Sequence, residues 1–268
     1  MNAPVATPVL LREDADHIAI LTLNRPQARN SLSEALIAAL SASLAEIAAD
    51  KRVRAVVIAA NGPAFCAGHD MKEMTARRSD ADRGRAYFKQ LMDACAAMMQ
   101  AVVHLPQPVI ACVQGPASAA GCQLVASCDL TVASQAAAFA TPGVNIGLFC
   151  STPMVALSRN VSRKHAMQML LTGDMVRAEE ARHIGLVNRV VAPGAERAEA
   201  LALARQIASK SALTVKIGKE AFYRQLEMSL ADAYKYGAGV MAENMMARDA
   251  EEGIGAFIEK RTPDWEDR

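Results

Sequence analysis

The feature that most constrains this chain is an alternation of two kinds of segment between His17 and about Thr152. We expect buried strands in the short apolar runs HIAILTLNRP, RAVVIAANG, PVIACVQG and LTVAS. Longer stretches between them repeat Leu, Ile and Ala at helical spacing, as in SLSEALIAALSASLAEIAAD and DADRGRAYFKQLMDACAAMMQAVVHL. Because apolar strands separated by helices are typical of parallel β–α–β units, the pattern predicts an α/β fold.

The second part of the chain has a different pattern. From about Thr152 onward the strand signals stop, and stretches such as RKHAMQMLLTG, GAERAEALALARQIASK and LADAYKYGAGVMAENMMARDA favour helices. The length of 268 residues, with 52% hydrophobic residues, suits one large core with an appended element. We therefore expect a sheet-containing core over residues 1–195 and a helical region over residues 196–268.

Charge and composition argue against several classes of partner. The net charge of +1 gives no electrostatic basis for binding nucleic acid or an anionic membrane. No uncharged apolar run is long enough to span a bilayer, and MNAPVATPVLLRED lacks the basic start and apolar centre of a secretory signal. Six cysteines without a CxxC pair lie in apolar or small-residue stretches, which indicates buried free thiols. These observations predict a cytoplasmic protein.

Two segments of small residues follow expected buried strands. They are NGPAFCAGHDMKEM, from Asn61 to Met74, and GPASAAGCQLVASCDL, from Gly115 to Leu130. Small residues let a ligand reach backbone N–H groups, and the first N–H groups of a helix lack helical partners. Either segment alone is also consistent with an ordinary loop or with close helix packing. Together they suggest two N–H donors aimed at one carbonyl oxygen.

The same two segments resemble the paired motifs of the enoyl-CoA hydratase/isomerase (crotonase) superfamily. Further similarity extends over nearly the whole chain, through LNRPQARNSLS, LLTGDMVRAEEARHIGLVNRVV and EEGIGAFIEKR. The resemblance implies a crotonase fold of repeated β–β–α turns with a C-terminal helical trimerisation region. It also implies a homotrimer or a dimer of trimers, an acyl-CoA thioester as substrate, and no cofactor other than the coenzyme A of the substrate.

The resemblance also implies roles for individual residues. The backbone N–H groups of His69 and Ala120 would form an oxyanion hole for the thioester oxygen, although most members have glycine at the position of Ala120. The remaining implied contacts to substrate and coenzyme A are Ala28, Arg29, Ala64, Ala67, Gly68, Asp70, Met71, Lys72, Pro142 and Lys260. Lys260 is equally consistent with a solvated surface charge. The other histidines show no metal-ligand spacing, so we expect no metal site.

The sequence departs from the family pattern at the two acid–base positions. A hydratase of this family uses one glutamate to activate water and another to protonate the α-carbon, and these positions are Gln123 and Gly143 here. An amide has no usable proton equilibrium and glycine has no side chain, so we expect crotonyl-CoA hydration to be slow or absent. Reintroducing both glutamates should then raise hydration. The missing side chain at Gly143 suggests room for a bound anion or a bulkier substrate.

Other groups and other functions stay open at this stage. His69 is the only histidine within either motif and is a candidate for the missing acid–base group. Cys150 or Ser151 could supply a nucleophile, but the sequence identifies no adjacent base. We expect an acyl-CoA enzyme with an atypical site. The alternatives are a non-catalytic acyl-CoA-binding protein and a thioester hydrolase or decarboxylase.

Overall fold

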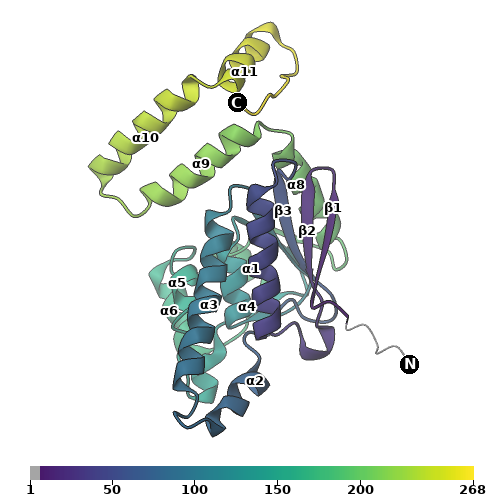
Figure 1. The fold of residues 1–268 in the computed structure, drawn as a ribbon, viewed down its shortest axis with the longest axis vertical. Coiled ribbons are helices and arrows are strands. Elements are labelled where there is room, and N and C mark those ends of the chain that lie inside the picture. Colours follow the sequence, from purple (N-terminus) through teal and green to yellow (C-terminus); the bar gives the residue numbers. More distant parts are fainter. Residues whose placement is uncertain (1–6) are drawn as a thin grey trace.

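The computed structural model describes residues 7–268, and its main feature is a sheet flanked by helices (Figure 1). The sheet has the strand order β1-β2-β3-β4-β6-β9. Its strands are β1 Leu10–Ala15, β2 Ile18–Leu23, β3 Ala55–Ala60, β4 Val109–Val113, β6 Leu130–Ser134 and β9 Arg189–Val191. Within this sheet all neighbouring strands from β2 onward pair in parallel, and only β1 is antiparallel to its neighbour. The predicted α/β fold is confirmed.

A smaller sheet lies beside the first one. It has the order β5-β7-β8, with bounds β5 Ala117–Ser118, β7 Ala138–Ala140 and β8 Val176–Arg177. Strands β8 and β9 lie beyond Thr152, so the expectation that strands end there was wrong. These strands are two and three residues long, too short for a hydrophobic period to be recognised. Strand β1 was also missed, because four of its six residues are exposed and it contains the charged sequence Arg-Glu-Asp.

Helices cover both faces of the six-stranded sheet. On one face lie α1 Glu34–Ala49, α3 Arg85–His104 and α4 Ala120–Ser127, whose buried residues belong to the larger apolar cluster. On the other face α8, Glu196–Ala208, contributes Ala200, Leu203 and Ala204 to a second cluster with Ile18 and Ile20. Successive residues of a strand point to opposite faces, so each central strand contributes to both clusters. The shorter helices are α2 Met71–Ala76, α5 Pro153–Leu157, α6 Arg163–Thr172 and α7 Ala178–His183.

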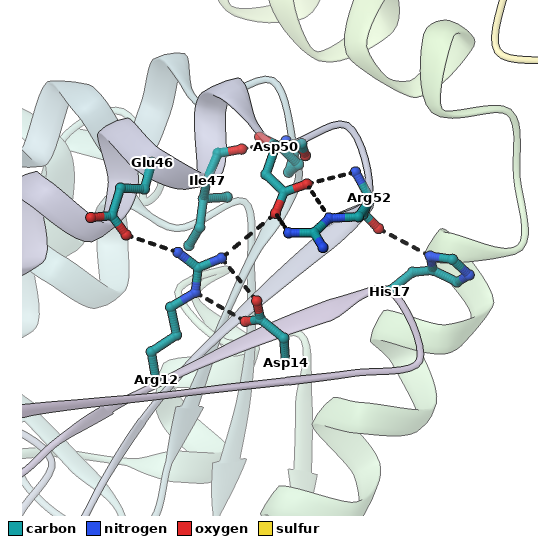
Figure 2. A network of polar contacts seen from close by, with 8 residues as sticks. Arg12, Asp14, His17, Glu46, Ile47, Asp50 and Arg52 are labelled. Atoms are coloured by element: carbon teal, nitrogen blue, oxygen red, sulfur yellow. Dashed lines mark hydrogen bonds and ion pairs between the residues drawn. The ribbon is translucent and has the colours of Figure 1, made fainter.

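The β1–β2 hairpin is fixed to the rest of the core by polar contacts (Figure 2). The chain reverses at Asp16 and His17, both with positive φ, as a tight hairpin turn requires. Arg12 of β1 donates a hydrogen bond of 3.1 Å to Glu46 of α1. The Nδ1 atom of His17 lies 3.0 Å from the backbone oxygen of Arg52. The only antiparallel strand of this sheet is thereby held against α1 and the start of β3.

The last three helices extend away from the sheet (Figure 1). They are α9 Ala212–Gln225, α10 Leu230–Met245 and α11 Arg248–Glu259. Large apolar side chains are exposed on these helices and on the residue after α9, namely Phe222, Leu226, Leu230, Tyr234, Met241, Met245, Ile254, Phe257 and Ile258. The domain boundary at residue 195 stays a prediction, but α8 packs on the sheet rather than with α9–α11.

The C-terminal tail returns from α11 to the core. The buried Asp249 carboxylate accepts hydrogen bonds from the N–H groups of Glu266 and Asp267. Asp267 then accepts a 2.6 Å bond from Arg54, which precedes β3. The indole N–H of Trp265 donates to the backbone oxygen of Ser209, directly after α8. The tail therefore connects the outermost helix to the sheet.

No helix within residues 7–268 is both long enough and apolar enough to cross a bilayer. Residues 1–6, which begin the stretch interpreted as lacking a secretory signal, lie outside the described residues.

Candidate active site

The structure brings the two small-residue segments together. Cys66 forms an isolated parallel bridge with Ala117, and the Ser118 N–H donates a 2.8 Å hydrogen bond to the Cys66 oxygen. A Cβ placed on Gly68 would lie 2.9 Å from the Cβ of Ala119 and 3.5 Å from the nitrogen of Ala120. The loop after β3 therefore lies directly against the start of α4. Gly68 also has φ +97°, which favours glycine.

Close packing explains part of the small-residue pattern. A Cβ on Gly121 would lie 2.2 Å from the backbone oxygen of Cys66, a distance that no side chain tolerates. Glycine is thus needed there for the first turn of α4 to reach the loop. The alternative of close helix packing is therefore correct at Gly121.

Backbone geometry leaves one N–H group free on each segment. Leu32 donates to the Gly68 oxygen at 2.8 Å, and Asp70 donates to the Leu32 oxygen at 3.1 Å. In a parallel bridge of this form, the residue between the two bonded positions, His69, directs its own N–H away from that partner. Ala120 is the first residue of α4, so its N–H has no acceptor within the helix. These are the two N–H groups that the sequence analysis singled out.

The turn into α4 is strained at Ala119. Its φ of 50° and ψ of −116° lie in a region that residues with a Cβ rarely adopt. The Ala119 N–H donates a hydrogen bond of 2.9 Å to the Ala140 oxygen, and this bond fixes the turn to β7. The strained turn separates β5 from α4 and makes Ala120 the first residue of the helix, which is buried along its whole length.

Asp70 holds the first loop in place. Its carboxylate accepts hydrogen bonds from Arg25 at 2.9 Å and from the Ser31 hydroxyl at 3.2 Å, and it caps α2 through the Lys72 N–H. Burial acts to raise the pKa of Asp70, but the bonds from Arg25 and from the start of α2 outweigh it, so the pKa is lowered. Asp70 is therefore an ionised anchor of the loop.

Three polar side-chain atoms in this region are buried and have no hydrogen-bond partner among the described residues. They are His69 Nε2, Gln123 Oε1 and Thr141 Oγ1. The register of β5 and β7, in which Ser118 pairs with Ala140, places Thr141 beside Ala119. Gln123 lies one turn into α4, where its N–H donates to the Ala119 oxygen. Burial lowers the pKa of His69, so its imidazole is neutral at pH 7.

Thr141 was missed by the sequence analysis. A threonine between a buried strand and a proline is ordinary in a sequence, and only its position before Pro142 and Gly143 pointed to this site. Its importance depends on strand pairing between segments that are distant in the chain, which a hydrophobic pattern does not reveal.

The space at Gly143 is occupied, contrary to the sequence-based expectation of room for an anion. A Cβ on this residue would lie 2.9 Å from the Leu148 oxygen and 3.0 Å from the Sγ of Cys150. The loop after the 3₁₀ turn Pro142–Ile146 therefore folds back over Gly143. A glutamate side chain at this position would have to displace Cys150.

Cys150 and Ser151 show no sign of activation as nucleophiles. Burial raises the pKa of the Cys150 thiol, against a smaller lowering by the Gly143 backbone, so the thiol stays protonated at neutral pH. The Ser151 hydroxyl donates only to the backbone oxygen of Phe149, at 3.3 Å. All six cysteines are buried and unpaired.

Other residues predicted to contact the substrate lie in three places. Ala28, Arg29, Ala64 and Ala67 adjoin Gly68, because Ala67 donates to the Arg29 oxygen and the Ala64 oxygen accepts from Asn30. Met71 and Lys72 are exposed on the first turn of α2. Lys260 caps the C-terminal end of α11, which lies at the opposite end of the molecule from α2 (Figure 1). A single chain does not bring Lys260 to the other residues.

Comparison with known proteins identifies the family. The family model for enoyl-CoA hydratase/isomerase matches residues 13–268. The chain belongs to this family. One curated relative is the mitochondrial enoyl-CoA hydratase domain-containing protein 3 of Xenopus laevis. The two are 45% identical over 259 residues, which cover 97% of this chain and 86% of the relative.

Solved structures support the same assignment. An enoyl-CoA hydratase from Mycobacterium smegmatis is 52% identical with a TM-score of 0.92, and the match covers 97% of this chain and 99% of that one. Human enoyl coenzyme A hydratase domain-containing protein 3 is 44% identical with a TM-score of 0.91, covering 96% of this chain and 100% of that one. The crotonase fold of this enoyl-CoA hydratase/isomerase family member is therefore confirmed.

Proposed function

We propose that this enoyl-CoA hydratase/isomerase family member binds an acyl-CoA thioester and stabilises negative charge on the thioester oxygen. The N–H groups of His69 and Ala120 would donate to that oxygen as an enolate-like charge develops. The proposal is supported by one observation above all, the packing of Gly68 against Ala119 and Ala120. Preorganised donors of this kind are usually the largest single contribution to such chemistry.

We further propose that ordinary hydration is not the main activity. Neither Gln123 nor Gly143 can take or give a proton, and each missing acid–base group costs roughly 10²–10⁴-fold in rate. His69 is the remaining group beside the proposed oxyanion hole that is able to accept a proton, because its imidazole is neutral and its Nε2 is unpaired. Any residual proton transfer is therefore assigned to His69.

The test measures hydration of crotonyl-CoA at high enzyme concentration, together with binding of butyryl-CoA by calorimetry. We expect butyryl-CoA to bind and hydration to be orders of magnitude slower than in an enzyme with both glutamates. His69→Gln should abolish residual turnover and preserve binding. Rapid hydration that survives His69→Gln would contradict the proposal.

A non-catalytic acyl-CoA-binding protein is the second candidate, and the absence of a carboxylate at Gln123 and Gly143 favours it. It predicts binding of butyryl-CoA with no turnover of any thioester. Hydrolysis by a cysteine nucleophile is less well supported, because the Cys150 thiol is protonated and buried. A bound anion at Gly143 is less well supported, because the Leu148 oxygen and Cys150 lie in that space.

We propose a homotrimer or a dimer of trimers as the functional assembly. Lys260 would then contact the coenzyme A of a neighbouring copy, since within one chain it lies far from α2 (Figure 1). No cofactor is proposed beyond the coenzyme A of the substrate. The cytoplasmic location stays a prediction, and the word mitochondrial in the relatives' names describes those proteins.

A further inference from the structure

We propose that Asn30 and Arg25 are positioning residues for the proposed oxyanion hole, because they hold the loop that carries the His69 N–H. Each acts through the backbone of residues 61–70 and not by touching the acyl group. The inference rests on the proposed function, which places the thioester oxygen at His69 and Ala120. It gives the segment between β2 and α1 a task beyond contact with coenzyme A.

The loop over residues 61–70 does not fix its own shape. It connects β3 to α2 and contains no helix or continuous strand. Among the backbone hydrogen bonds of residues 7–268, none joins two residues of this loop. Its bonded N–H groups donate outside the loop, to the backbone oxygens of Leu23, Arg29, Leu32 and Pro116. The direction of the His69 N–H therefore depends on the segments that surround the loop.

Asn30 fixes the start of the loop. Its Nδ2 donates a hydrogen bond of 2.8 Å to the Asn61 oxygen and one of 2.9 Å to the Ala64 oxygen. Its Oδ1 accepts a bond of 2.8 Å from the N–H of Arg25. The residue is fully buried and has φ 52°, a left-handed conformation that asparagine adopts more readily than most residues. Asparagine thus supplies both the turn and three bonds at this place.

Arg25 fixes the end of the same loop. Its guanidinium donates hydrogen bonds to the Asp70 carboxylate at 2.9 Å and to the Ser31 backbone oxygen at 2.6 Å. The side chains of Arg25 and Asp70 are 17% and 12% exposed, so solvent screens this ion pair less than a surface pair. Because Asp70 directly follows His69, the pair holds the backbone next to the proposed donor.

His69 lies between these two attachments. Ala67 donates to the Arg29 oxygen at 3.0 Å, and Leu32 is bonded to the residues on either side of His69. Residues 25–32 therefore hold the loop at its start, just before His69 and just after it, while the His69 N–H stays free. Hydrogen bonds weaken as the donor turns away from its acceptor, so an oxyanion hole requires donors held in advance.

The same attachment reaches the segment of the second donor. The Ala64 oxygen that accepts from Asn30 also accepts a hydrogen bond of 3.0 Å from the Gln114 side chain. Gln114 lies between β4 and β5, in the segment that leads to Ala120. One backbone oxygen is therefore bonded to both segments, which relates the positions of the two proposed donors.

The experiment measures the infrared stretch of the thioester carbonyl of butyryl-CoA, isotope-labelled at that carbon and bound at saturating protein. Hydrogen bonds to a carbonyl oxygen weaken the double bond, so the bound ligand should absorb at a lower frequency than the free ligand. We expect Asn30→Gly to lose most of this shift and Arg25→Lys to lose part of it. Glycine adopts positive φ freely, so Asn30→Gly removes the amide without backbone strain. Arg25→Lys keeps the charge and loses the planar fork of donors.

Gln107→Ala is the matched control. The buried Gln107 amide also donates to two backbone oxygens, those of Ile47 and Asp50. It lies where β4 begins, at the opposite edge of the parallel sheet from the end of β3. Gln107→Ala should lower the midpoint of urea denaturation, as Asn30→Gly does, and leave the carbonyl shift unchanged.

The outcomes separate the inference from the proposed function. A carbonyl shift that survives in both Asn30→Gly and Arg25→Lys would overturn the inference. A shift that is lost equally in Gln107→Ala would also overturn it, because the signal would then follow stability alone. Butyryl-CoA that binds the unmodified protein without any shift would overturn the proposed function itself.

Discussion

Ala119 carries the clearest conformational strain at the site, with φ 50° and ψ −116°. Such a conformation costs roughly 1–3 kcal/mol for a residue with a Cβ, whereas glycine adopts it freely. Ala119→Gly should therefore raise the free energy of unfolding by about 1 kcal/mol, after the larger entropy of unfolded glycine is subtracted. Urea denaturation measures this change.

The control is Ala45→Gly on the exposed side of α1, which should lower the free energy of unfolding by about 1 kcal/mol. If the two substitutions are equally destabilising, the backbone at Ala119 is not strained.

Gly143 shows why a missing catalytic group is not restored by one substitution. Its added Cβ would lie 3.0 Å from Cys150 Sγ, so Gly143→Ala should lower the free energy of unfolding by roughly 1–3 kcal/mol. Cys150→Ala should recover part of this loss, because the two residues compete for one space. Gly218→Ala on α9 meets no atom within 4 Å and should not be destabilising. Thermal melts of the variants measure these differences.

The same geometry revises the expected rescue of hydration. Gln123→Glu with Gly143→Glu should raise crotonyl-CoA hydration more when Cys150→Gly is also present, because that change removes one of the two closest contacts at Gly143. The other, with the Leu148 backbone oxygen at 2.9 Å, remains and requires the loop to shift. A double variant that hydrates as fast as the triple variant would show that the loop moves aside without cost.

His69 gives the protein a distinctive pH dependence. Burial lowers the pKa of folded His69 below its ordinary value near 6.5, so the unfolded chain binds the proton more readily. Its contribution to stability is therefore fully present above about pH 6.5 and is lost as the pH falls toward the lowered pKa. His69→Gln should flatten the decline in the free energy of unfolding between about pH 7 and pH 5. An unchanged slope in this variant would contradict the assignment.

Helix α9 is joined to the core by one buried polar cluster. The Lys219 ammonium donates hydrogen bonds to one Asp129 carboxylate oxygen at 2.7 Å and to the backbone oxygens of Val102 and Gln107. The Tyr223 hydroxyl donates a hydrogen bond to the other Asp129 oxygen. Lys219→Met leaves the Asp129 charge without its counterion, so it should lower the free energy of unfolding by about 3–5 kcal/mol. Denaturant titration measures the loss. Lys216→Met, exposed on the same helix, is expected to change stability little, and a similar loss in both would refute the role of the pair.

Elements with a strong period were predictable from the sequence, and short or polar ones were not. Helices α1 and α3 and strands β2, β3, β4 and β6 were recognised because many residues repeat one pattern. Strands β8 and β9 depend on pairing with distant segments, and β1 is largely exposed and charged. The site divides in the same way. The segments of His69 and Ala120 have local signatures, whereas the neighbourhood of Thr141 and the occupied space at Gly143 exist only in the folded chain.

For the whole molecule, the exposed apolar side chains of α10 and α11 indicate a surface that other copies cover. Phe257 is 84% exposed and Met246 is 83% exposed, and large contiguous apolar surfaces usually mark interfaces. Analytical ultracentrifugation should give a species of at least three times the chain mass of 28.5 kDa. The double variant Phe257→Glu with Met246→Glu should shift the population toward monomer. The control, Lys51→Glu at an exposed position remote from α10 and α11, should leave the assembly unchanged. A monomeric unmodified protein would contradict the proposed assembly.

The tail that returns from α11 has a practical consequence. Trp265 is the one tryptophan of the sequence, and it contacts Gly253 of α11 while donating to Ser209 beside α8. Intrinsic fluorescence of this protein therefore reports mainly on the attachment of its last residues, and circular dichroism reports on all helices. If the emission changes at a lower temperature than the ellipticity, the C-terminal helices separate before the sheet melts, and unfolding is not two-state. The chain thus contains its own optical probe of how its outer helices are held.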